Sequence, residues 1–545
     1  MRHVGRAGAG RTGNRGGPGS CGRRRALRPR RRAARAEGRR RQPAERRGAR
    51  RNPRSLRAAT MSYDVARTLR STLLWRAAAL LLGVCFVASV PLVVEPAEFG
   101  RFNVVFSAAQ VLAAALLLWP NQGFLRQARQ ELHETGGLSG SLAARLALHL
   151  ALSVLFIGVA IVASHMIADW LGLGRGIVAA CVIGIALAQS TTEIGIMALQ
   201  ARARFETFNL APIFQRAGQL CGLAAIAYAS AADAALHAWA LLAAGTIAGY
   251  LASGINAWTR VPVRLDWASA GDRARRIVGH SWTLPATSMA AFVLAWVDIW
   301  LINAFVGIEA AGVYSFAYLA TTLATAILAP VVAALLPRSI DHQIAGDSAS
   351  ETHSRERIAS TVLVAGALAP LAVVVVAAAL AAIPLGSYAA ARAPLVLLCA
   401  GIVFQLAMAL GETVVYARAD LVRRYALVVI GMVAVNAALD VALIPLIGVE
   451  GAAIATVATY AFGMVAQWWL IRIPGRRLEL LLYTMAGFAT ATLVLYDSLA
   501  AIVAAGLVAT AALCLAGWSG GRFAPFLALL PAGAGRPSVA PNGES

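Results

Sequence analysis

Four charged residues lie inside long apolar segments, where ionisable groups are costly and mark candidate functional positions. Glu193 and Arg216 fall in neighbouring segments, near the same end of each. This pair suits an anion-binding or proton-coupled gate, and it suits equally well a structural ion pair that lets both helices insert. Asp298 and Asp440 lie in two further segments, near the opposite end. Either carboxylate could take up a proton or Na⁺, or could instead cap a helix or form an interhelical hydrogen bond.

Arginines border the same ends as Glu193 and could bind an anion, because a guanidinium makes charge-assisted, bidentate hydrogen bonds. The candidates are Arg76, Arg126, Arg129 and Arg338. Membrane topology alone also requires arginines at these places. Glu412 is close enough to a segment end to reach water. Further polar residues could line a wet cavity or join helices: Asn103, Gln110, Gln215, Gln219, Asn303, Gln405 and Asn436.

Motifs of enzymes and metal sites are missing from the sequence. It contains no phosphate-binding GxxxxGK[ST] loop, no nucleophile triad and no paired carboxylates in a soluble segment. The six cysteines form no CxxC motif, and the histidines show no metal-ligand spacing. We therefore expect neither an enzyme nor a bound cofactor or metal.

The segments that carry these residues are long enough to cross a bilayer, which takes about 20 apolar residues. With 59% hydrophobic and 14% charged residues, the chain is far more apolar than a soluble protein. No segment alternates like a barrel strand, so the spans are helices. The sequence predicts an all-α polytopic membrane protein with about fourteen transmembrane helices. Their expected ranges are 75–94, 102–120, 144–166, 176–198, 208–229, 233–254, 283–305, 310–335, 359–384, 394–416, 425–446, 450–471, 479–496 and 499–518.

The distribution of arginine predicts the orientation and sets the first 60 residues apart. Eighteen arginines fall in connections on one side and three on the other, so both termini are expected in the cytoplasm. Residues 1–60 carry 21 arginines and two glutamates, a net charge of +19, which leaves +4 for the remainder. This leader has almost no apolar content and is expected to be disordered. Three interpretations of the leader stay open: upstream sequence before a true start at Met61, a basic tail that contacts anionic lipid or nucleic acid, or an organellar transit peptide. Its charge does not make the remainder a nucleic-acid-binding protein.

An internal repeat links the two halves of the chain. At an offset of 212, Gly100 matches Gly312, Phe102 matches Tyr314 and Phe106 matches Tyr318. Arg202 matches Arg418 at an offset of 216. The offset spans six helices, so both halves share one membrane orientation and are expected to face each other across an axis along the membrane normal. We predict lobes at 61–271 and 272–472, an extra helix pair at 473–520 and a cytoplasmic tail at 521–545.

Three stretches resemble the polysaccharide-biosynthesis (Wzx-type flippase) branch of the multidrug/oligosaccharidyl-lipid/polysaccharide exporter superfamily. They are PAEFGRFNVVFSAAQVLAAALLLWPNQGFLRQARQEL (96–132), WVDIWLINAFVGIEAAGVYSFAYLATTL (296–323) and NAALDVALIPLIGVEGAAIATVATYAF (436–462). The last is similar to a family signature across the eleventh and twelfth helices. Related exporters use acidic residues to take up the coupling ion.

The resemblance implies flipping of an oligosaccharide on a polyprenyl pyrophosphate carrier, across the cytoplasmic (inner) membrane, by alternating access between two lobes. Its partners would be the lipid-linked oligosaccharide, membrane lipid and a polysaccharide polymerase with export machinery. The site candidates are then Arg76, Arg126, Arg216 and Glu193 for substrate and Asp298 and Asp440 for the coupling ion. The other functions considered are a cation-coupled multidrug exporter, a lipid II flippase and a non-transport scaffold.

Overall fold

The computed structural model describes residues 65–202, 204–232, 237–262, 264–282, 284–325, 355–356, 358–362, 364 and 384–472. The predicted leader, most of the predicted span 359–384, the extra helix pair, the tail and Arg338 lie outside these residues. The described elements are α2 (Val65–Val93), α3 (Pro96–Ala113), a π-helical segment (Ala114–Leu118), α4 (Pro120–Thr135), α5 (Ser139–Leu171), α6 (Arg175–Ala201), α7 (Phe205–Ala231), α8 (Ala238–Trp258), α9 (Ala270–Ser281), α10 (Leu284–Phe305), α11 (Ile308–Thr325), a 3₁₀ helix (Gly386–Ala391), α14 (Arg392–Ala417) and α15 (Ala419–Ile471).

The all-helical membrane architecture is confirmed for the described part of the chain, which contains no strand. Seven stretches there are long and apolar enough to cross a membrane. One of them lies in α15, which a kink at Ile447 and Gly448 divides in two; Gly448 has a φ of 62°, which suits a residue without a side chain. The break falls between the predicted spans 425–446 and 450–471. The count of fourteen stays a prediction.

The N-terminal helices pack as one bundle. α8 packs against both α6 and α7, while α3 packs against α6 and α8 and α2 lies along α7. α4 follows the π-helical segment directly and is rich in polar residues. It begins at Pro120, whose missing backbone N–H costs little at the start of a helix. The short helix α9 packs against α4 and α5.

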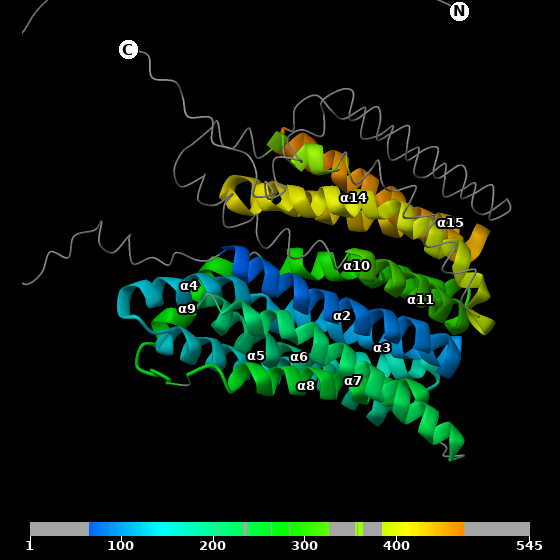
Figure 1. Ribbon diagram of the computed structural model, residues 1–545, viewed down its shortest axis with the longest axis horizontal. Coiled ribbons are helices and arrows are strands. Elements are labelled where there is room, and N and C mark those ends of the chain that lie inside the picture. The colour runs from blue at the N-terminus through cyan, green and yellow to red at the C-terminus, as the bar shows by residue number, and fades with distance from the viewer. Residues whose placement is uncertain are drawn as a thin grey trace, which may run out of the picture. The chain divides into compact units, whose positions relative to one another are not determined.

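The C-terminal helices form a second group that meets the first through four helices. Within it, α15 packs against α10 and α14, and α11 against α14. α10 and α11 run beside α2 and α3, and α11 packs closely along α3 (Figure 1). Helix bounds repeat across the groups: α2 ends at Val93 and α10 at Phe305, an offset of 212 (305 − 93). The same offset separates the first residues of α3 and α11, Pro96 and Ile308.

Candidate functional site

The C-terminal half contains a buried cluster around Asp298 of α10. The hydroxyl of Tyr314, on α11, and that of Thr456, on α15, both donate to Asp298 Oδ2, each over 2.5 Å. The two hydroxyl oxygens are 2.9 Å apart. Three helices therefore converge on one carboxyl oxygen.

Asp440, on α15, belongs to the same cluster. Its carboxyl interacts with that of Asp298, and Asn436 Nδ2, one turn earlier, donates to Asp440 Oδ2 over 3.0 Å. Asp298 is 3% exposed and Asp440 0%. The structure thus brings together two acids that lie far apart in the sequence and were predicted as separate ion-coupling candidates.

The cluster has the composition of a cation-binding site. Asp298 Oδ1, Asp440 Oδ1 and Asn436 Oδ1 are buried and accept no hydrogen bond. The partners of both acids in the described residues are hydroxyl, amide and carboxyl groups, with no basic side chain among them. Carboxylate and amide oxygens are ligands for hard cations, and a buried carboxylate without a counter-charge takes up a proton or a cation. Sequence reasoning named Asn436 only as a polar residue and missed Thr456.

The N-terminal half contains a different charged group, and here the predicted pairing of Glu193 with Arg216 is wrong. Glu193, on α6, interacts electrostatically with Arg145 of α5. Arg216, on α7, has no acidic partner in the described residues. The reason is the packing order: α8 lies against both α6 and α7, and its Tyr250 interacts with both Glu193 and Arg216.

Arg145 is a second residue that the sequence analysis missed. It lies in the second turn of α5, which begins at Ser139 and not near residue 144 as predicted, and it is 0% exposed. Its Nε and Nη2 donate to Asn121 Oδ1 over 3.1 and 2.9 Å, and Nη2 also donates to the Leu117 carbonyl over 2.7 Å. Leu117 belongs to the π-helical segment, so Arg145 joins α5 to the transition from α3 to α4. Nη1 is buried without a hydrogen bond.

Arg216 is available for an anion. Its Nη1 donates to Gln219 Oε1 over 2.8 Å, and its guanidinium carbon lies 5.8 Å from the centre of the Phe86 ring on α2. Neither partner neutralises its charge, although the ring face attracts a cation. The half-buried side chain is therefore an uncompensated cation within a membrane helix.

The remaining candidates lie on α2, α4 and α14. Arg126, on α4, is exposed, and its Nη1 lies 3.4 Å from Nδ1 of His280 on α9. Desolvation and then the charge of Arg126 lower the pKa of His280, which keeps its ring neutral and able to accept. Arg129 is exposed. The backbone of Arg76 lies in α2, and its side chain is outside the described part. Glu412, on α14, accepts a hydrogen bond from Tyr425 over 2.8 Å.

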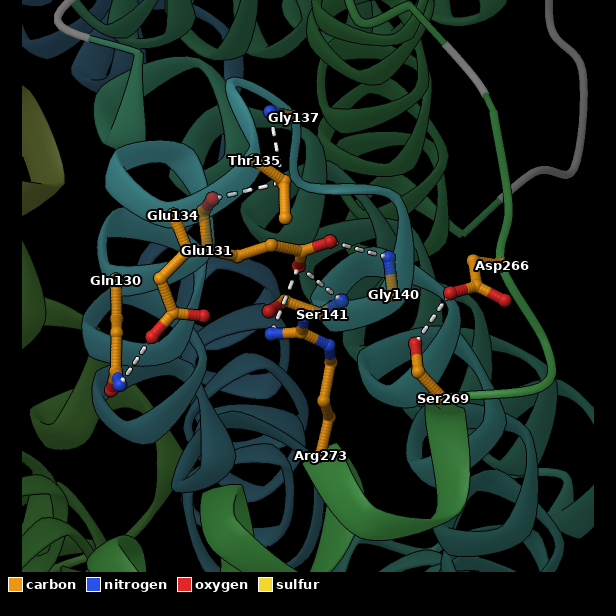
Figure 2. Close-up of polar contacts among 10 residues, drawn as sticks. All are labelled: Gln130, Glu131, Glu134, Thr135, Gly137, Gly140, Ser141, Asp266, Ser269 and Arg273. Carbon is orange, nitrogen blue, oxygen red and sulfur yellow. Dashed lines mark hydrogen bonds and ion pairs between the residues drawn. The ribbon is translucent and has the colours of Figure 1, made fainter. Parts of the chain in front are cut away.

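A buried carboxylate fixes α9 against the N-terminal bundle. Glu131, on α4, accepts hydrogen bonds from Gly140 N and Ser141 N at the start of α5, over 3.0 and 2.8 Å, and pairs with Arg273 of α9 at 3.5 Å (Figure 2). Asp266 accepts from Ser269 over 2.7 Å just before α9 begins. This cluster positions the helix that carries His280, the partner of Arg126.

Comparisons with known proteins place this architecture in a class. The structure has the fold of a lipid II flippase, MurJ, in an inward closed conformation, with a TM-score of 0.59, 10% identity and coverage of 83% of this chain and 98% of that one. An outward-facing multidrug resistance MATE transporter of the MOP superfamily aligns with a TM-score of 0.51 and 14% identity, covering 76% and 97%. At these identities the likeness concerns the fold.

The family of the chain is shown by its amino-acid sequence. The family of polysaccharide biosynthesis proteins matches residues 94–385, more than half of the chain. The chain belongs to this family, which confirms the resemblance found in its sequence. No match was found among curated protein sequences.

Proposed function

We propose that the protein moves a polyprenyl-pyrophosphate-linked oligosaccharide from the inner to the outer leaflet of the cytoplasmic membrane, with both of its termini in the cytoplasm. The observation that carries the proposal is membership of the polysaccharide biosynthesis family, in a fold shared with flippases and exporters. The pyrophosphate needs cationic, wetted surface, because an ion in hydrocarbon costs several kcal/mol at least. Arg216 supplies an uncompensated guanidinium for it, and Arg76 and Arg126 lie nearer the inner surface in the proposed topology.

The coupling ion binds at Asp298 and Asp440, with Asn436 and Thr456 as neighbours. This assignment is supported by the three buried oxygens that accept no hydrogen bond and by the lack of a basic partner in the described residues. The ion is a proton or Na⁺, since oxygen donors suit both. Glu193 has no part in holding Arg216. It balances Arg145 instead.

The test measures accumulation of lipid-linked oligosaccharide in the outer leaflet, in cells that lack the native protein. Arg216→Ala is expected to abolish accumulation at a normal protein level, and Arg216→Lys to retain part of it, because a point charge replaces a bidentate fork. Arg175→Ala is the control, since Arg175 is exposed and paired with Asp169 at 2.8 Å. Full accumulation with Arg216→Ala would remove Arg216 from substrate binding.

Two further functions compete, and the same cells separate them. A multidrug exporter of this fold would lower the intracellular level of a cationic dye and leave the outer-leaflet oligosaccharide unchanged. A lipid II flippase would restore growth to cells that lack lipid II transport. Either result, without oligosaccharide accumulation, would contradict the proposed substrate.

A further inference from the structure

Two helices related by the internal repeat lie directly against each other. α3 and α11 occupy equivalent places in the two halves, because they begin at Pro96 and Ile308, an offset of 212 (308 − 96). They pack closely along each other (Figure 1). A pair of repeat-related helices can meet in this way only if it lies on the axis that relates the halves.

Contacts between α3 and α11 are reciprocal. A Cβ added to Gly100 would overlap the carbonyl oxygen of Ile308, and one added to Gly312 would overlap the carbonyl oxygen of Pro96. Gly100 matches Gly312, and Pro96 matches Ile308, at the same offset of 212. Each half therefore offers the same glycine and the same carbonyl to the other, which is the pattern of an isologous two-fold contact.

Only glycine allows this approach of the two backbones. The same added Cβ atoms would lie 3.1 Å from Gly312 N and 3.0 Å from Gly100 N, so backbone atoms make the closest contacts at both positions. Small residues let membrane helices approach closely, and contacts of this kind involve weak Cα–H···O interactions. No ion pair of the described residues joins α3 to α11. Between these two glycines, the described contact is therefore backbone against backbone, without an ion pair.

Aromatic rings form a second layer further along each helix. Phe102 stacks on Phe106 with centroids 5.6 Å apart, and their repeat partners Tyr314 and Tyr318 stack at 6.3 Å. Trp296 of α10 touches Phe106 at 5.5 Å and Tyr318 at 6.2 Å, so one indole contacts both halves. The glycine contact thus covers an aromatic layer that spans the interface.

We propose that Gly100 and Gly312 form the closing contact between the two halves, at the end where the α2–α3 and α10–α11 turns lie, and that this contact separates in each transport cycle. The inference rests on the proposed alternating access. A larger residue at either glycine holds the halves apart and shifts the population toward the state open at that end, which is the outer side in the proposed topology. Because the contact is reciprocal, the two positions are equivalent in effect.

The experiment uses purified full-length protein in liposomes, with its native cysteines replaced and Ser107→Cys as reporter. Ser107 is buried beneath the contact and accepts a hydrogen bond from Trp300 over 2.8 Å. Gly100→Ala and Gly312→Ala are each expected to raise its reaction rate with an impermeant maleimide about tenfold, the order expected when a methyl group is forced into a packed contact. Gly158→Ala is the matched control, because a Cβ there meets nothing within 4 Å. It should leave the rate unchanged.

The outcomes separate this inference from the proposed function, because labelling requires no sugar substrate. If both glycine variants fold and their labelling rates at position 107 stay within twofold of the rate without a glycine substitution, the proposed closing contact is overturned. This holds even if the protein flips oligosaccharide. An increase at only one glycine would also overturn it, since reciprocity requires both. If neither variant folds, the reporter is measured in cells with both glycines intact. Labelling that rises with transport supports the contact, and a reporter that stays unlabelled throughout active transport overturns it.

Discussion

The hairpins α2–α3 and α10–α11 have matching bounds but different side chains at equivalent positions. The offset of 212 that aligns their ends places Phe86 opposite Asp298 and Phe102 opposite Tyr314. In the C-terminal hairpin the acid accepts the hydrogen bond of the tyrosine, whereas both equivalent N-terminal residues are buried phenylalanines. One backbone arrangement therefore serves as apolar packing in one half and as an ion-site candidate in the other.

The two halves also differ in how their ionisable residues inside the helices are balanced by opposite charges. In the N-terminal half, the half-buried Glu193 interacts electrostatically with the buried Arg145, so an acid lies near a base. In the C-terminal half, Asp298 and Asp440 interact with each other without a basic partner in the described residues. The first arrangement is complete within the protein. In the proposed function, a proton or a cation completes the second.

The largest effect is expected from removing the acid that distinguishes the hairpins. Asp298→Asn, and separately Asp440→Asn, should reduce ion-driven transport at least about tenfold, since either change removes one of the two charges that attract the cation. The measurement is oligosaccharide flipping in vesicles with an imposed Na⁺ or proton gradient. Arg175→Ala, at an exposed ion pair outside the cluster, is the control and should keep most activity. Unchanged gradient dependence in both Asn variants would exclude the cluster as the coupling site.

The next effect concerns the balanced pair of the N-terminal half. Arg145→Met should lower stability by about 3 kcal/mol, because it leaves two acceptors, Asn121 Oδ1 and the Leu117 carbonyl, without their donor, at about 1–3 kcal/mol each. It also removes the counter-charge of Glu193. Thermal unfolding in detergent measures it. Arg145→Met with Glu193→Gln should recover part of the loss. A double variant less stable than Arg145→Met alone would contradict the pairing of these two charges.

The smallest effect comes from exchanging the aromatic residues of the two hairpins. Tyr314→Phe should weaken cation dependence about tenfold, because a hydrogen bond to a charged group contributes about 1.5–3 kcal/mol and fixes the orientation of Asp298. Phe102→Tyr adds a hydroxyl where Phe86 offers no acceptor, and should lower stability by about 1–3 kcal/mol without changing cation dependence. Transport measured at increasing concentrations of the gradient ion gives the cation dependence of both variants, and thermal unfolding gives their stability. Equal effects of both substitutions on cation dependence would contradict the difference between the hairpins.

The sequence by itself determined the helical membrane class, the repeat and most of the ionisable residues inside the spans. Hydropathy and arginine placement are properties of each segment alone, so they can be obtained without knowing its neighbours. Gly100 and Gly312 were also recognised as equivalent, because glycine and aromatic positions survive comparison better than aliphatic ones. The family signature at 436–462 contains Asn436, Asp440 and Thr456, yet only Asp440 was singled out as an ion ligand.

Only the tertiary structure decided which of these residues meet. Asp298 reaches Asp440 because α10 packs on α15, and Glu193 turns to Arg145 because α8 packs against both α6 and α7. Arg145 was missed because it lies near a helix end, where an arginine is ordinary until the neighbouring helices bury it. The physical reason is that burial, helix rotation and neighbour order depend on side-chain packing between distant segments, which no single segment of the sequence contains.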